Sequence, residues 1–141
     1  DGRYYGFEAD VTARIADTLD VGGNLTYTHR KLTDPTNPAF RPQGVPDWKL
    51  FAYANWRALP KLTIRPNLEY ADQRWTVTTS TPLAYYRTGS YMLVNLAAEY
   101  DVTDKLKLTV AAQNLGDQDY QLTDGFPEAG RSFYASVRAR F

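Results

Sequence analysis

Apolar residues recur at every second position along seven stretches of the chain. Between Tyr5 and Ile15, for example, the odd positions are apolar and the even positions are glycine, threonine or charged. A period of two predicts β-strands that present one apolar and one polar face. The expected strands cover residues 4–16, 21–30, 48–57, 62–70, 92–102, 106–113 and 133–141.

These expected strands are long. The eleven residues from Tyr5 to Ile15, at roughly 3.3 Å per residue and a tilt of about 45°, span about 25 Å. This is the height of the apolar band of an outer-membrane barrel, whereas strands of soluble proteins are about half as long. The pattern therefore favours strands that cross a membrane.

Short and long connections alternate along the chain. The expected short turns are residues 17–20, 59–61 and 103–105, and the long loops are residues 32–46, about 73–89 and 116–130. Transmembrane barrels have this asymmetry, with short turns in the periplasm and long loops outside the cell. A soluble propeller has a similar repeat length, but it needs four short strands per repeat, and here each repeat holds two long ones.

Two residues depart from the alternation. Phe51 is an apolar residue on the polar side of its strand, and Pro66 has no backbone N–H for the ladder. Because proline within a strand often accompanies an irregularity, we expect a bulge at Pro66.

Charged residues are absent from the apolar faces of the expected strands. The opposite faces hold Glu8, Asp10, Arg14, Arg30, Lys49, Arg57, Arg65, Glu69, Glu99, Lys107, Arg138 and Arg140. A membrane barrel turns such a face toward its wet interior and a soluble barrel turns it outward, so alternation alone leaves both open. Strand length and loop asymmetry favour the membrane. A soluble β-sheet binding protein is the alternative, and a need for detergent would distinguish the two.

Composition excludes several functions. The chain has 16 basic and 16 acidic residues, no cysteine and a single histidine, His29. It therefore shows no basic footprint for nucleic acid, and we expect no metal site, no cofactor and no enzymatic activity. The carboxylates Glu8, Asp10, Glu69 and Glu99 lie on different strands among as many arginines, so salt bridges explain them better than catalysis.

Aromatic residues make up 14% of the chain, with eleven tyrosines. Rings of this kind gather at the two edges of a membrane-spanning band. We expect an outer belt of Trp48, Trp75 and Tyr91 and an inner belt of Trp56, Tyr100 and Phe141.

The last stretch of the chain carries the most specific motif. It contains NLGDQDY from Asn114, then GFPEAGRSFY, then an alternating strand that ends on Phe141. This combination resembles the C-terminal signature of TonB-dependent outer-membrane receptors, roughly N-L-F-D-x-x-Y, G-x-P-x-x-G-R and a closing strand with a terminal aromatic. Gly116 stands where an aromatic is commoner.

The resemblance implies an all-β, antiparallel transmembrane β-barrel of the 22-stranded type, in the bacterial outer membrane. Seven strands are present, and a bacterial barrel needs an even number. We therefore expect residues 1–141 to be the C-terminal segment of a receptor barrel domain, with the plug domain and the N-terminal strands absent.

The resemblance also implies function and partners. TonB-dependent receptors import scarce ligands, most often ferric siderophores, and are energised from the inner membrane through the TonB system. The implied partners are outer-membrane lipid, the plug domain and the barrel-assembly machinery, which would read Phe133, Val137 and Phe141 of the terminal strand. A passive outer-membrane pore, or a fragment that serves as a substrate of the assembly machinery, is the alternative.

Ligand contacts are expected in the long loops. Tyr85, Tyr86 and Arg87 combine aromatic rings with a cation, which suits an anionic, ring-bearing iron chelate. Arg41 and Tyr120 are further candidates of the same kind. Packing within the loops or a place in an aromatic belt is the alternative for all five.

Overall fold

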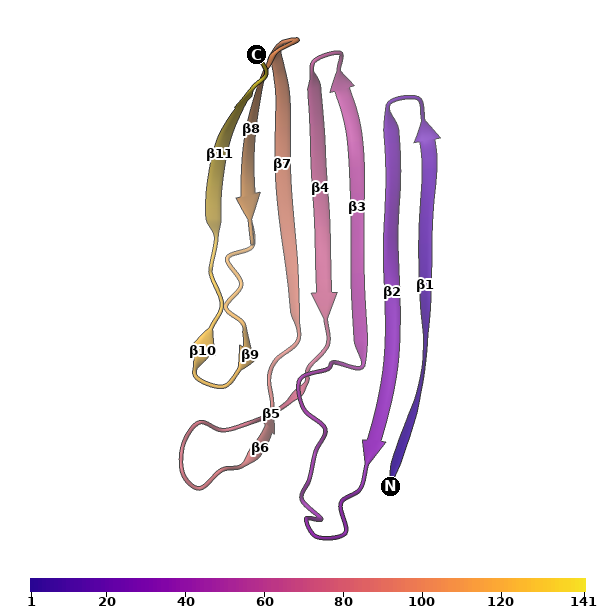
Figure 1. Ribbon diagram of the computed structural model, residues 1–141, viewed down its shortest axis with the longest axis vertical. Coiled ribbons are helices and arrows are strands. Elements are labelled where there is room, and N and C mark those ends of the chain that lie inside the picture. Colours follow the sequence, from indigo (N-terminus) through magenta and orange to yellow (C-terminus); the bar gives the residue numbers. More distant parts are fainter.

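The computed structural model describes residues 1–141 and contains the seven expected strands in one antiparallel sheet. The order is β1-β2-β3-β4-β7-β8-β11, so each strand pairs with the next long strand along the chain. The bounds are β1 Gly2–Ala16, β2 Leu19–Leu32, β3 Trp48–Leu59, β4 Leu62–Ala71, β7 Tyr91–Thr103, β8 Leu106–Gln113 and β11 Ser132–Ala139. In Figure 1 the short turns lie at the upper end of the sheet and the long connections at the lower end. The expected loop asymmetry is confirmed.

The register keeps the apolar positions of neighbouring strands on one face. Ala9 pairs with Leu25 and Leu25 with Leu50, and the row continues through Tyr70 to Met92. Directly opposite residues share a face of a sheet, and a slip of one residue would move a whole strand's apolar set to the other face. The register therefore builds one continuous apolar face across the strands.

This apolar face is uncovered. Val11 is 65% exposed, Val110 47% and Phe133 73%, and only 8 of 141 residues are buried. The small buried cluster of Ala71, Tyr91 and Leu93 lies at the loop end of the sheet. No second layer packs on the apolar side, as it would in a soluble sandwich. The face therefore needs an apolar surrounding.

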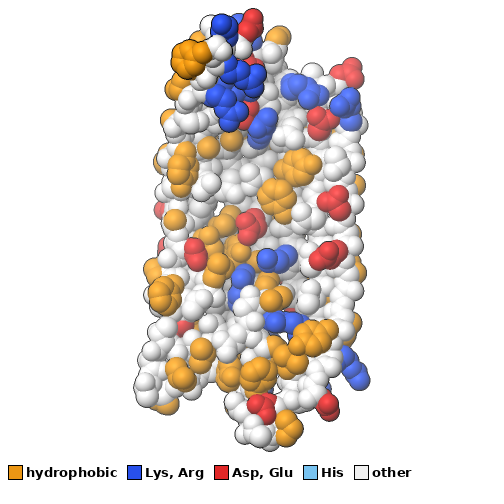
Figure 2. All heavy atoms as spheres, viewed as in Figure 1, with side chains coloured by type: hydrophobic (Ala, Val, Ile, Leu, Met, Phe, Trp, Pro, Cys, Tyr) orange, Lys and Arg blue, Asp and Glu red, His pale blue; other side chains and the backbone are white.

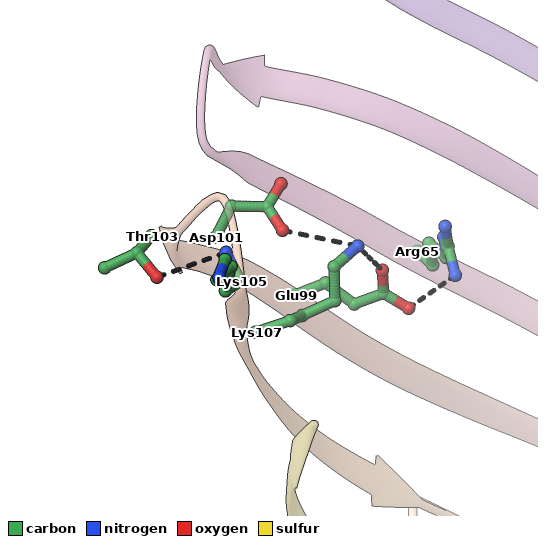
Figure 3. A network of polar contacts seen from close by, with 6 residues as sticks. All are labelled: Arg65, Glu99, Asp101, Thr103, Lys105 and Lys107. Carbon is green, nitrogen blue, oxygen red and sulfur yellow. Dashed lines mark hydrogen bonds and ion pairs between the residues drawn. The ribbon is translucent and has the colours of Figure 1, made fainter. Parts of the chain in front are cut away.

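Basic and acidic side chains lie together on the polar face (Figure 2), and several of them form connected ion pairs. Glu99 of β7 lies 2.5 Å from Arg65 of β4 and 3.2 Å from Lys107 of β8, and Lys107 lies 3.4 Å from Asp101 (Figure 3). Near the first turn, Asp20 pairs with Arg14 at 3.1 Å and Arg57 at 3.2 Å. The predicted use of these charges in salt bridges is confirmed for Glu99, whereas Glu8, Asp10 and Glu69 form no ion pair.

The predicted bulge at Pro66 is wrong. The pairing of β3 with β4 passes from Tyr53↔Asn67 to Trp56↔Ile64 without a change of register, and Pro66 is paired with Leu96 on its other side. A missing N–H removes one hydrogen bond from the ladder, but it does not require an inserted residue. At the proline the pairing of β4 with β3 is interrupted, while its pairing with β7 continues.

Two small hairpins were not predicted. β5 (Trp75–Val77) pairs with β6 (Tyr85–Arg87), and β9 (Gln121–Thr123) pairs with β10 (Phe126–Pro127). Both lie inside expected long loops, at the lower end of the sheet in Figure 1. The structure contains no helix that is long and apolar enough to cross a membrane.

Candidate ligand-binding rim

Two arginines from different connections meet at one tryptophan. The guanidinium carbons of Arg41 and Arg87 lie 5.7 and 4.8 Å from the ring centroid of Trp75. Trp75 stands opposite Arg87 in the β5–β6 pairing, and the Gly44 N–H donates to the Trp75 carbonyl at 3.0 Å. Gly44 has a φ of 81°, which glycine adopts without strain, and this lets the loop of residues 33–47 run beside β5. Both arginines are thus placed for cation–π contact.

These residues border a pocket of about 340 Å³ between the end of β2, the loop of residues 33–47 and the start of β5. Five cations line it, Arg30, Lys31, Arg41, Arg74 and Arg87, against three carboxylates, Asp34, Asp47 and Asp72. Asp34 Oδ1 accepts from the hydroxyl and the N–H of Thr36 at 2.7 and 2.8 Å. The hydroxyl bond holds the pKa of Asp34 below its usual value, which favours its ionised form. Because the five cations outnumber the three carboxylates, the pocket, which we call the rim pocket, favours an anion.

Arg74 is the residue of the rim pocket that the sequence did not point out. Its exposure is 8%, and its Nη2 is buried without a hydrogen-bond partner. The guanidinium carbon lies 5.7 Å from the ring centroid of Tyr91. A buried guanidinium nitrogen without an acceptor is costly, because it has lost water and gained nothing in return. Arg74 thus brings an unsatisfied donor next to the rim pocket, buried beneath its surface.

Tyr85 and Tyr86 point to different neighbours. Tyr85 stands edge-on to Phe40, another residue of the rim pocket, with ring centroids 6.4 Å apart. The Tyr86 hydroxyl donates to Asp124 Oδ1 at 2.9 Å and accepts from Gln121 Nε2 at 3.2 Å. Among the five predicted contact residues, Arg41 and Arg87 come together, Tyr85 lies beside them, and Tyr86 turns to the neighbouring loop.

Asp124 fastens the two loop hairpins together. Besides the Tyr86 hydroxyl, its carboxylate accepts from the Thr79 N–H at 2.8 Å and the Thr79 hydroxyl at 3.1 Å. The bond from the Thr79 N–H is the main reason why the pKa of Asp124 is lowered. Burial, followed by the bond to Asp124, raises the pKa of Tyr86. The wall beside the rim pocket is therefore held by polar bonds rather than by an apolar core.

Tyr120 lies apart from the two arginines. Its ring packs on Tyr91 with centroids 4.5 Å apart, next to the buried cluster. Burial raises its pKa. Tyr91 was expected in the outer lipid belt, but it is 6% exposed and its hydroxyl donates to Glu69 at 3.0 Å. That expectation is wrong, because Tyr91 falls on the polar face of β7.

The terminal motif forms the connection between β8 and β11, and its polar side chains hold this connection together; we call this arrangement the clasp. Asn114 is buried, and its side chain accepts from the Gln118 N–H and donates to the Gln118 carbonyl, both at 2.9 Å. Asp117 accepts from the Arg131 N–H at 2.8 Å, and a Cβ on Gly130 would come within 3.0 Å of the Asp117 carboxylate. The motif residues therefore set the path of the loop, which explains their spacing.

The predicted assembly residues are all exposed. Phe133 is 73% and Val137 67% exposed, and Phe141 is fully exposed. β11 ends at Ala139, two residues earlier than expected, although the Arg140 N–H still donates to the Lys105 carbonyl at 2.9 Å. One side of β11 pairs with β8, and the other is an edge of the sheet.

No group of three His, Cys, Asp or Glu side chains is arranged to hold a metal ion.

Comparison with known proteins places these features in context. A family model described as "TonB dependent receptor-like, beta-barrel" matches residues 1–115. The ferripyoverdine receptor of Pseudomonas aeruginosa is 28% identical over 130 residues, which are 86% of this chain and 15% of that protein. The iron-regulated outer membrane virulence protein of Vibrio cholerae is 25% identical over 139 residues, 97% of this chain and 21% of that protein. The chain thus spans about a fifth or less of the length of these relatives.

Solved structures share the fold. The ferripyoverdine receptor of the outer membrane of Pseudomonas aeruginosa, bound to ferripyoverdine, matches with a TM-score of 0.81 and 24% identity over 98% of this chain and 19% of that chain. The siderophore receptor PiuA from Acinetobacter baumannii matches with a TM-score of 0.79 and 21% identity over 98% of this chain and 22% of that chain. In both, nearly all of this chain matches about a fifth of the other chain.

Proposed function

Because the chain belongs to the family of TonB-dependent receptor β-barrels, we propose that it forms part of a receptor for the uptake of a ferric siderophore across the outer membrane. The family consists of outer-membrane receptors and not of enzymes, and the uncovered apolar face fits that location. The curated relatives named above include a receptor for ferripyoverdine and an iron-regulated outer-membrane protein. In this proposal the ligand is a ferric siderophore and the TonB system supplies the energy for uptake.

The rim pocket is the observation that supports an iron chelate. Arg41 and Arg87 lie against Trp75, and buried Arg74 has a free donor nitrogen. Ferric chelates commonly carry anionic oxygens and often an aromatic ring. Guanidinium groups suit the oxygens through charge-assisted hydrogen bonds, and the tryptophan suits the ring. We place the chelate in contact with Arg41 and Arg87, with Tyr85 beside them and with Arg74, Tyr86 and Tyr120 in supporting positions.

The partners follow from the same proposal. The TonB system would energise uptake through a plug domain in the longer protein, and lipid would surround the apolar face. The barrel-assembly machinery would recognise β11 through Phe133, Val137 and Phe141, which are exposed on the apolar side at an edge of the sheet. A passive pore is the competing function, and it requires neither a plug nor energy.

Binding and transport test the proposal separately. In the longer protein that contains this chain, the double variant Arg41→Gln/Arg87→Gln should bind ferric pyoverdine-type and ferric catecholate chelates roughly 10- to 100-fold more weakly, because charged hydrogen bonds are lost. The double variant Lys61→Gln/Lys105→Gln changes the charge equally at the opposite end of the sheet and should leave binding intact. Equal binding by all three proteins would contradict the placement of the chelate.

Uptake of radiolabelled iron then separates a receptor from a pore. Transport by a TonB-energised receptor should stop in cells that lack TonB, whereas diffusion through a passive pore should continue. Unchanged uptake without TonB would refute the receptor function even if the chelate binds.

A further inference from the structure

Two cations interrupt the apolar face at its loop end. Arg3 of β1 and Lys31 of β2 occupy the same alternating positions as Tyr5, Phe7 and His29. Every other Lys, Arg, Asp and Glu within the seven strands falls on the polar face. A charge on a lipid-facing surface is costly in the middle of the membrane and tolerated near its edges. The position of the two cations is therefore a feature of the membrane boundary.

Arg3 and Lys31 are direct cross-strand partners in the β1–β2 register. Like charges in this arrangement repel each other, because opposite side chains on one face are about 5 Å apart at Cβ. Neither cation forms a salt bridge within the chain. Asp1, which precedes β1, and Asp47, which precedes β3, form no ion pair with either cation, and Asp47 lies 3.7 Å from His29 instead. The pair thus lacks a counter-ion.

Aromatic rings adjoin the cation pair on the membrane side. Tyr5 lies against His29 with ring centroids 4.9 Å apart, and Tyr27 lies 4.5 Å from Trp48, which Phe7 contacts edge-on at 5.9 Å. Such a cluster of rings marks the level of the lipid headgroups in membrane proteins. Because the long loops lie at this end, it is the outer leaflet. The two cations therefore sit at headgroup height, just above the rings.

We propose that Arg3 and Lys31 form a binding site for the phosphate of a phosphorylated lipid of the outer leaflet. Both side chains are exposed and can donate to one phosphate, which relieves their repulsion. The rings of Tyr5 and Phe7 below them are 55% and 50% exposed and offer an apolar wall to the acyl chains. This continuity of charge and apolar surface favours a lipid over a soluble anion. The inference rests on the membrane location and is independent of the iron chelate.

The test uses lipid A as the probe. The longer protein is prepared in nanodiscs of uncharged phospholipid, and binding of bisphosphorylated lipid A and of its dephosphorylated form is measured by native mass spectrometry. The double variant Arg3→Gln/Lys31→Gln should bind the bisphosphorylated form about 25-fold more weakly, because each cation near an anionic lipid contributes roughly a factor of five. The variant Lys61→Gln/Lys105→Gln, with the same charge change at the opposite rim, should bind it like the parent.

Each further outcome bears on the proposal. Equal affinity of the parent for both forms of lipid A, or unchanged affinity in the Arg3/Lys31 variant, would overturn it. Millimolar inorganic phosphate is tested as a competitor. If it displaces the bound lipid as effectively as added lipid A does, Arg3 and Lys31 bind a soluble anion, and this would also overturn the proposal. Because Lys31 also borders the rim pocket and Arg3 does not, chelate binding is compared on the single variant Arg3→Gln. Weaker lipid binding with intact chelate binding in Arg3→Gln is the expected result, and unchanged lipid binding there would overturn the proposal.

Discussion

The two faces of the sheet are built from the same strands and are stabilised by different interactions. From Tyr5 to Ile15 the apolar side of β1 has no charged group and no layer packed on it. The polar side of the neighbouring strands carries connected ion pairs, such as Arg65, Glu99 and Lys107 (Figure 3). In water the exposed apolar face would promote aggregation, whereas the polar face would be well solvated. In a membrane barrel the apolar face meets lipid and the polar face meets water. The difference indicates which side of the sheet meets lipid.

The largest expected effect comes from a charge placed on the apolar face. Lysine at Val11 or Val110 should lower the free energy of unfolding in lipid vesicles by roughly 2 to 4 kcal/mol, because the side chain lies near the middle of the apolar band. Lysine at the neighbouring Thr12 or Thr109 should change it little. Urea titration of the protein in lipid measures both. Equal costs on the two faces would abolish the distinction between them.

A medium effect is expected at Asn114, which is buried just beyond the end of β8. Asn114→Ala removes the bonds to the Gln118 N–H and carbonyl, and it should cost about 1 to 3 kcal/mol because buried backbone groups lose their partners. Asn24→Ala is the matched control, since Asn24 is an exposed asparagine of β2. The same titration applies. A cost at Asn24 as large as that at Asn114 would show that the motif is not a special clasp.

The smallest effect is expected from the ion pairs themselves. Arg65 and Lys107 are 48% and 37% exposed in their side chains, so water and salt screen them. Glu99→Gln should lower the free energy of unfolding by at most about 1 kcal/mol, and the loss should shrink at high salt. Glu8→Gln, which removes an acid that forms no ion pair, is the control. A loss of several kcal/mol at Glu99 would mean that this face is dry.

The strands could be predicted from the sequence because their alternation extends over eight or more residues. The loop hairpins could not. β5, β6 and β9 have three residues each, too few to show a period. Arg74 could not be predicted as a site residue either, because the sequence does not show that the fold buries its guanidinium. Trp75 was expected in a lipid belt, but the side chains that approach it come from Arg41 and Arg87.

The terminal motif could be recognised from the sequence, but its contacts could not be predicted from it. Its spacing was enough to suggest the family, but the role of Asn114 became visible only when its side chain was seen to bond Gln118. Gly116 departs from the usual motif, and the structure has open space around it, so a larger residue is not needed there for packing. A motif thus identified the fold, and the contacts explain why its residues are spaced as they are.

The central claim, that the apolar face meets lipid, is tested most directly by spin labels. The chain has no cysteine, so single cysteines at Val110 and at the adjacent Thr109 can each carry a label in the protein reconstituted in a bilayer. The account predicts that the label at position 110 collides with oxygen dissolved in lipid, and that the label at position 109 collides with a water-soluble nickel complex. The same collision pattern at both positions, or the reverse pattern, would contradict it.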